Sequence, residues 1–392
     1  MDSPVLWEGP LTWTFAMPYL LRTGALLFAA LALSACSSLS TLRTPVPGPL
    51  AETAAVAAST AGEPIRYWGD EPLPPTREFA GRGADRQAQY LSLSGGGANG
   101  AYGAGYLVGW SQRGDRPEFE VVTGISVGAL IAPMAFLGPG YDTRLQQVFV
   151  DLATWRDRGP GVLAALFGAP GIASNRPVMA AIARLVDAPT LDAIAREHQK
   201  GRRLLIGTTN LDAERPVIWD IGAIASSNLP NRLQLVRQIM LASAAIPGIY
   251  PPVLIKVQAG GRTYDELHVD GAVTQQILLF PNGFDAITGG GSGNRQLYVI
   301  YNGMVEPSHE SVEISSLAVL ERSIPTLLKY RGRGEISLLS NAARAEGIRY
   351  RMTAIPPEFP DSEEIFPSPE WLAKLYAYGV ENGRLGTWQG KE

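Results

Sequence analysis

The feature that most constrains the fold is a strand–turn–helix unit that occurs twice in succession. The first copy runs from the apolar QYLSLS through GGGANG into GAYGAGYLVGWSQRG, a helical pattern that ends at Gly114. The second copy runs from FEVVTGIS directly into the helical VGALIAPMAFL. Repeated units of this kind are typical of parallel α/β sheets. We therefore expect an α/β fold with three layers, α/β/α, around a mostly parallel central sheet.

Further elements are expected downstream of the two units. The apolar segments 202–211 and 295–303 predict buried strands. Segment 232–248 predicts a helix that is stopped by Pro-Gly, and segments 311–330 and 368–383 predict two more helices. The apolar stripes of the last two helices are expected to face the core.

The length allows one large globular domain or two modest ones, and the composition argues against nucleic-acid binding. Of the 392 residues, 46% are hydrophobic and 18% are charged, which is enough to bury a sizeable core. The net charge is -4 and the isoelectric point is about 5.6. Nucleic-acid binding needs a basic face, so this class of partner is not expected.

The N-terminal residues 1–36 have the pattern of an exported lipoprotein. GALLFAALALSAC, which ends at Cys36, has the length of a signal-peptide core, and Met17 makes a natural start for it. The sequence LSAC resembles a bacterial lipobox, which implies that Cys36 receives a diacylglyceryl group and anchors the chain to a membrane. Ser37 follows, and by the same resemblance this favours the outer membrane of a Gram-negative cell envelope.

The segment that follows, residues 37–86, is rich in Pro, Ala, Ser and Thr. Such a composition buries too little surface to order itself, so we predict a tether. Within it, the apolar IRYWGD at 65–70 is a candidate for docking onto the domain. Residues 87–392 are then expected to form the α/β domain.

The second turn contains a candidate nucleophile. Gly124, Ser126 and Gly128 form the pattern G-x-S-x-G between a predicted strand and a predicted helix. In a nucleophile elbow the serine sits on a sharp, strained turn, and its neighbours two residues away must be small. Ser126 is therefore the predicted nucleophile.

The first turn suits an oxyanion hole. Attack by a serine on an ester carbonyl creates an oxyanion, which backbone N–H groups stabilise. Gly95, Gly96 and Gly97 permit a turn whose N–H groups face a common space. We predict that these three glycines form the oxyanion hole.

A serine nucleophile also needs a base, and the chain has three histidines. His198 lies at a polar helix end and is expected to be solvated, while His309 lies in a loop. His268 is expected to pack or to join a polar network. Two residues later comes Asp270, in the sequence DGA after a predicted strand.

These motifs together resemble the patatin-like phospholipases. The matches are GGGANG, GISVG and DGA, in that order, with further likeness at 242–253 and an overall extent of 87–279. The resemblance implies hydrolysis of phospholipid or other acyl esters through a dyad of Ser126 and Asp270, without histidine and without a cofactor. Where this family often has Arg or Lys, the chain has Asn99, which puts a strict preference for phospholipids in doubt.

Two other interpretations stay open. Gly95, Gly97 and Gly100 fit the dinucleotide pattern G-x-G-x-x-G, as in an oxidoreductase, although the second strand ends without the acidic residue that holds a ribose. A non-catalytic lipoprotein that binds lipid or protein is the other. No metal-binding motif is present, so no metal is expected. The sequence leaves the oligomeric state and the acyl-chain specificity open.

Overall fold

The computed structural model describes residues 43–56, 65–72, 88–154, 173–278, 294–360 and 367–389. The predicted signal segment with Cys36 lies outside the described residues. The chain divides into two units, Met1–Thr44 and Pro45–Glu392. The elements below all belong to the second unit.

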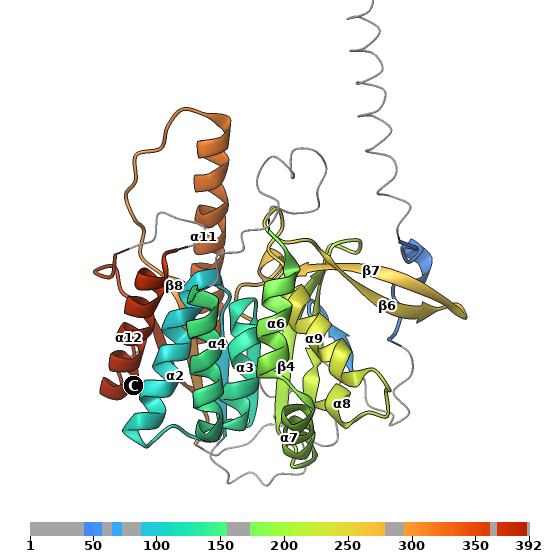
Figure 1. The fold of residues 1–392 in the computed structure, drawn as a ribbon, viewed down its shortest axis with the longest axis horizontal. Helices are drawn as coiled ribbons and strands as arrows, with labels where there is room; N and C mark the ends of the chain where they lie inside the picture. The colour runs from blue at the N-terminus through green and yellow to red at the C-terminus, as the bar shows by residue number, and fades with distance from the viewer. Residues whose placement is uncertain are drawn as a thin grey trace, which may run out of the picture. The chain divides into compact units, whose positions relative to one another are not determined.

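Among the described residues, nine strands form one sheet (Figure 1). Seven of them lie in the order β1-β5-β4-β3-β2-β8-β9, and β7 pairs with both β4 and β6. The strands from β4 to β9 along this order are parallel, whereas β1, β5, β6 and β7 pair antiparallel. Their bounds are β1 Arg66–Trp68, β2 Gln89–Leu93, β3 Val121–Ile125, β4 Arg203–Asn210, β5 Arg215–Asp220, β6 Val253–Ala259, β7 Arg262–Asp270, β8 Gln296–Met304 and β9 Arg349–Ile355.

Helices cover both faces of this sheet. The α-helices are α2 Gly100–Arg113, α3 Val127–Leu137, α4 Asp142–Thr154, α6 Asn175–Leu185, α7 Ala188–Gln199, α8 Ile221–Ser226, α9 Arg232–Ser243, α11 Ser316–Ala345 and α12 Pro369–Leu385. Short 3-10 turns are η2 Gly48–Leu50, η4 Gly97–Asn99, η5 Pro139–Tyr141 and η6 Gly271–Val273. Every described helix is too short or too polar to cross a bilayer.

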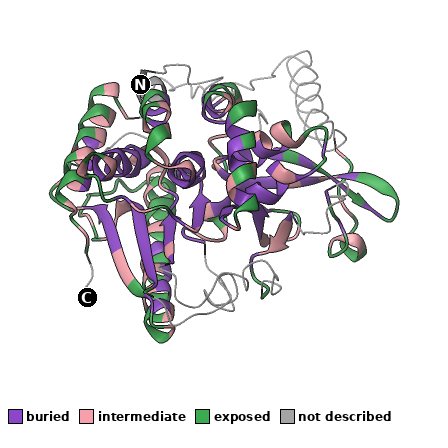
Figure 2. Cartoon of the chain, turned by 90° about the horizontal axis from the view of Figure 1, so that it is seen from below, coloured by how far each residue is buried: buried purple, intermediate pink, exposed green. Residues whose placement is uncertain are grey.

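Side chains that alternate along the strands belong to two separate hydrophobic cores, one on each face of the sheet. On β2, Leu91 and Leu93 join the larger core with α2, α3 and α9, whereas Tyr90 joins a second core that includes Leu339 and Ala343 of α11. Successive side chains of a strand point to opposite faces of a sheet. The buried strands therefore lie between two helical layers (Figure 2), and the predicted α/β/α fold with a mostly parallel sheet is confirmed.

The helix predicted over 311–330 has different bounds. It begins at Ser316 and continues to Ala345, across Gly332 and Gly334. The second half is helical because Leu339 and Ala343 pack against the sheet, and tertiary packing of this kind outweighs the low helix propensity of glycine.

The boundary predicted at residue 87 is corrected, because parts of the predicted tether pack with the domain. The IRYWGD segment forms β1 and extends the sheet beside β5, as its apolar character suggested. Residues 45–56 also belong to this unit, with Ala54 and Val56 buried in the larger core.

Candidate active site

Ser126 occupies a sharp turn between β3 and α3. Its backbone has φ 55° and ψ -125°, in the region that L-residues rarely adopt. Such a conformation costs on the order of 1–3 kcal/mol and is typical of functional turns. It makes Ser126 the last residue before the N-terminus of a buried helix, as the elbow predicts.

The two glycines that flank Ser126 leave no room for a side chain at their positions. A Cβ on Gly124 would lie 2.5 Å from the carbonyl oxygen of Gly128. A Cβ on Gly128 would lie 2.4 Å from the carbonyl oxygen of Leu93 on the neighbouring strand. A side chain at position 124 would therefore push the start of α3 away from β3, and one at position 128 would push the elbow away from β2.

The strand order brings Ser126 and Asp270 together from positions 144 residues apart. Strand β4 lies beside β3, and Asp270 on β7 pairs with Thr208 on β4. The Ser126 hydroxyl donates a hydrogen bond of 2.6 Å to Oδ2 of Asp270, and both side chains are buried. The two predicted residues therefore meet in the geometry of a nucleophile and its base.

Backbone contacts hold Asp270 in place. The N–H of Ala272 donates to Oδ1 at 2.8 Å, and the N–H of Asp270 donates to the carbonyl of Ala245 at 3.0 Å. Gly271 packs so tightly that a Cβ there would lie 2.6 Å from the carbonyl oxygen of Gly207. This close approach explains why glycine follows the aspartate.

Ser243 was missed by the sequence analysis. Its hydroxyl, at the end of α9, accepts the N–H of Ser126 at 2.9 Å and donates to the carbonyl of Gly207 at 2.7 Å. It thus ties the backbone of the elbow to β4. The only sequence signal was its position inside the stretch 242–253.

The prediction that all three glycines donate to an oxyanion is wrong for Gly95. Its N–H already donates to the carbonyl of Gln276 at 3.0 Å. Gly95 instead leaves room beside the nucleophile, because a Cβ there would lie 3.3 Å from that of Ser126. Within the described part of the chain, no acceptor is found for the N–H of Gly96 or Gly97.

Strand β8 fixes the shape of this glycine loop. Gly96 has φ 152°, and a Cβ there would lie 1.8 Å from the carbonyl oxygen of Asn302. The Asn302 side-chain amide donates to the carbonyl of Ser94 at 2.9 Å, and the N–H of Asn302 donates to the Ser94 hydroxyl at 2.7 Å. The loop is therefore held from β8, on the side of β2 away from β3, and the N–H groups of Gly96 and Gly97 have no acceptor among the described residues.

Comparison with known proteins agrees with this geometry. The sequence profile of the family described as patatin-like phospholipase matches residues 91–280, which include the glycine loop, the elbow and Asp270. This segment is a patatin-like phospholipase domain. It belongs to a family of lipid hydrolases.

Two further comparisons add context to the patatin-like domain. One solved structure with some likeness is the crystal structure of VipD from Legionella pneumophila, at 13% identity and a TM-score of 0.33. That alignment covers 89% of this chain and 71% of VipD. A search of curated proteins found no match.

Burial sets the acidity of Asp270 in the patatin-like domain. Loss of solvation raises the pKa of this carboxyl from 3.8 to about 7, although the hydrogen bonds from Ser126 and Ala272 lower it in part. A free aspartate is too weak a base to activate a hydroxyl. A carboxyl group with a pKa near 7 can both accept and return a proton at neutral pH, because its protonated and ionised forms are then similarly populated.

His268 belongs to a buried network beside the dyad. Its Nδ1 lies 3.0 Å from the Thr208 hydroxyl, and its Nε2 lies 3.2 Å from a carboxylate oxygen of Glu266. Glu266 also pairs with Arg66 on β1. His268 therefore joins a polar network that links β4, β7 and β1, as predicted. The structure shows no contact between His268 and Ser126.

Of the predictions for the other two histidines, one is wrong and one is confirmed. The expectation that His198 is solvated is wrong: the side chain is buried, 3.6 Å from Asp220, because α8 packs on it at Gly222. His309 is exposed in the loop before α11, as expected. Asn99 ends η4, and its N–H donates to the carbonyl of Gly96 at 3.1 Å.

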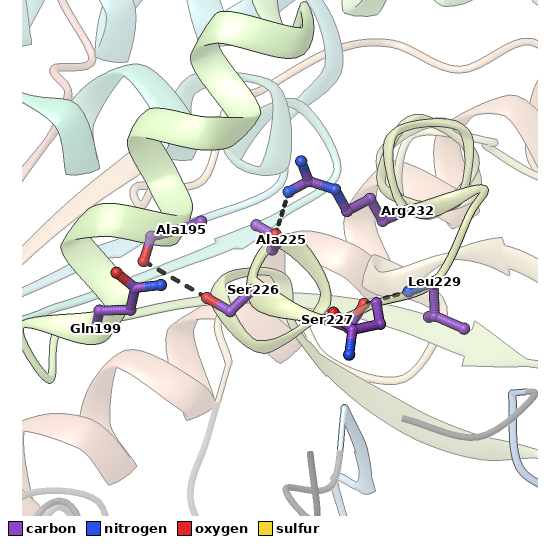
Figure 3. Close-up of a pocket in the computed structure, with 8 residues that line it drawn as sticks. Ala195, Gln199, Ala225, Ser226, Ser227, Leu229 and Arg232 are labelled. Atoms are coloured by element: carbon purple, nitrogen blue, oxygen red, sulfur yellow. Dashed lines mark hydrogen bonds between the residues drawn. The ribbon is translucent and has the colours of Figure 1, made fainter. Parts of the chain in front are cut away.

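A separate cavity of about 420 Å³ lies among α7, α8 and α9 (Figure 3). Its lining contains neither Ser126 nor Asp270. Arg232 in this cavity donates to the carbonyl of Ala225 and forms an ion pair with Asp192. Its guanidinium is thus engaged within the fold, and the cavity is not part of the candidate active site.

Proposed function

We propose that this protein is a serine acyl-ester hydrolase that cleaves lipid esters through an acyl-Ser126 intermediate. The observation that carries the proposal is the 2.6 Å hydrogen bond from Ser126 to the buried carboxylate of Asp270. The glycine loop beside it, with two N–H groups free of described acceptors, supplies the complementary oxyanion site.

In the first half of the reaction, Asp270 takes the proton of the Ser126 hydroxyl as the oxygen attacks the ester carbonyl. The N–H groups of Gly96 and Gly97 stabilise the resulting oxyanion, and each such donor is worth about 2.7–4 kcal/mol of transition-state stabilisation. The C–O bond to the leaving alcohol then breaks, and protonated Asp270 returns its proton to that alcohol.

In the second half, water attacks the acyl-Ser126 ester and Asp270 acts as the base again. The oxyanion forms in the same place, so the same glycines stabilise it. Collapse releases the fatty acid and restores the Ser126 hydroxyl with the proton from Asp270.

The alternative functions fit the site less well. In a dinucleotide site the glycine turn is open to a pyrophosphate, but here Gly95 faces Ser126 and Gly100 packs against Val127. A lipoprotein that only binds lipid or protein has no use for a buried carboxylate hydrogen-bonded to a strained serine. The acyl hydrolase therefore accounts for more of the observed contacts.

A lipid panel tests the proposed reaction. The 392-residue chain is incubated with diacyl phospholipid, lysophospholipid and a neutral acylglycerol, and released fatty acid is measured. We expect release of fatty acid from at least one lipid without any added dinucleotide. No release from any of them, together with saturable binding of NAD(H), would favour the oxidoreductase instead.

The pH dependence of hydrolysis follows from the role of Asp270 as base. The carboxyl must be ionised to accept the Ser126 proton, and its pKa is about 7. We expect kcat/KM to rise with pH as a single ionisation near 7 and to level off above it. A profile already flat from pH 5 upward would show that no group with this pKa acts as the base.

We also propose that Cys36 carries a lipid and anchors the chain to the outer membrane. The support is the lipobox-like LSAC after an apolar segment. Cys36→Ser is expected to abolish incorporation of labelled palmitate and to leave the signal segment uncleaved, as measured by mass spectrometry. Unchanged labelling and processing of this variant would rule out lipidation at Cys36.

A further inference from the structure

The first half of α11 extends beyond the other helices of the domain (Figure 1). None of its described apolar side chains belongs to either hydrophobic core, in contrast to Leu339 and Ala343 of the second half. Five large side chains of the first half expose half of their surface or more: Val319, Leu320, Ile324, Leu327 and Tyr330.

Three of these residues form a stripe along one side of the helix. Leu320, Ile324 and Leu327 are spaced i, i+4, i+7, which places them on the same helical face. The prediction that the apolar stripe of this helix faces the core is therefore wrong for these three residues, which face solvent. Contiguous exposed apolar surface of this kind marks an interaction site.

A basic collar follows the stripe. Lys329, Arg331 and Arg333 follow Leu327 within six residues, and Tyr330 lies among them. Arg331 pairs with Glu335, whereas Lys329 and Arg333 form no ion pair with a described residue. In the preceding loop, Glu310 pairs with Arg322, and Glu306 contacts Lys329 only through its carbonyl. Apolar residues followed by basic and aromatic ones match the layers of a bilayer surface, from acyl chains to anionic headgroups.

Hydrogen bonds connect the collar to the candidate active site. Arg331 donates to the carbonyl of Val273 at 2.6 Å, and Glu335 accepts the N–H of Ile277 at 2.8 Å. This segment follows Asp270, and its Gln276 carbonyl accepts the N–H of Gly95. The base of the projecting helix is therefore joined to both the aspartate motif and the glycine loop.

We propose that the first half of α11 docks onto a phospholipid bilayer that contains anionic lipid. Leu320, Ile324 and Leu327 enter the acyl region, and the basic collar lies at the level of the phosphates. The proposal rests on the proposed function for its substrate, a lipid ester within the same surface. Docking through α11 holds the segment after Asp270 close to that surface, so that an acyl ester has a short path to Ser126.

A local fluorescent probe tests the docking. Cys36 is the sole cysteine, so a chain with Cys36→Ser and Leu327→Cys takes a single environment-sensitive label at position 327. The variant Ser126→Ala is included so that no lipid is hydrolysed and the result does not depend on catalysis. The matched control places the label at Leu385→Cys, a similarly exposed leucine at the end of α12.

Vesicles of phosphatidylethanolamine and phosphatidylglycerol are expected to shift the emission of the label at 327 to the blue and to leave the label at 385 unchanged. Adding Leu320→Glu is expected to lower the ratio of inserted to exposed label at 327 about tenfold. An unchanged label at 327, or equal shifts at both positions, would overturn the proposal. So would a shift that needs no vesicles and grows with protein concentration, because it would indicate self-association through the stripe.

Discussion

Ser126→Ala is expected to lower ester hydrolysis by about 10,000-fold or more, because it removes the atom that forms the acyl-enzyme. The fold should persist, since the hydroxyl contributes one hydrogen bond, to Asp270, and the strained backbone of the elbow is held by Ser243. The measurement is kcat/KM on a soluble ester and on the best lipid of the panel, with circular dichroism as the check on folding.

Ser92→Ala is the matched control for this variant. Ser92 is also buried at the carboxyl-terminal half of a central strand, and its hydroxyl lies 2.9 Å from that of Thr123. Its removal is expected to cost about 1 kcal/mol of stability and to leave hydrolysis near the wild-type rate. If both variants retained the wild-type rate, a nucleophile other than Ser126 would be required.

Asp270→Asn is expected to lower kcat/KM by about 100- to 10,000-fold, the usual contribution of a general base. The asparagine keeps the size of the side chain and its bond from the N–H of Ala272, but it cannot accept the Ser126 proton. Asp265→Asn makes the same change on the same strand, at a carboxylate paired with Lys256, and is expected to keep full activity. Equal activity in the two variants would remove Asp270 from the mechanism.

Asp270→Asn, which is expected to lower activity, is expected to raise the stability of the fold. The folded-state pKa of Asp270 is raised from 3.8 to about 7, so its buried carboxyl favours folding while protonated and loses that contribution as pH rises through 7. The shift corresponds to at most about 4 kcal/mol, at 1.36 kcal/mol per pKa unit. We therefore expect Asp270→Asn to be more stable than the wild type at pH 8 and this advantage to shrink toward pH 4, as measured by urea unfolding.

The local part of the site was predictable from sequence, because local spacing determines it. The elbow follows from Gly124 and Gly128, whose absent side chains admit the turn, and its position between strand and helix is visible in the periodicity of the chain. Asp270 is different. Its contact with Ser126 depends on β7 pairing with β4, and no pattern in the sequence specifies that pairing, so the aspartate was found through resemblance to a family.

The misassigned residues share one cause, which is a partner distant in the chain. Gly95 has the right residue type for an oxyanion donor, but its N–H is taken by Gln276 from the segment after Asp270. His198 looked solvated because its own helix end is polar, yet α8 covers it from later in the chain. The second half of α11 is helical despite its glycines because it lies on the sheet. Such contacts follow from the tertiary fold and leave no local signal.

Acylation of Ser126 is tested most directly by mass spectrometry of the quenched enzyme. During turnover of a long-chain ester, we expect an added acyl mass on the peptide that contains Ser126. Fast acid quenching should trap this adduct in the wild type, and the adduct should be absent from Ser126→Ala. Acylation at a different residue, or continued turnover by Ser126→Ala without any adduct, would contradict the proposed role of Ser126 as nucleophile.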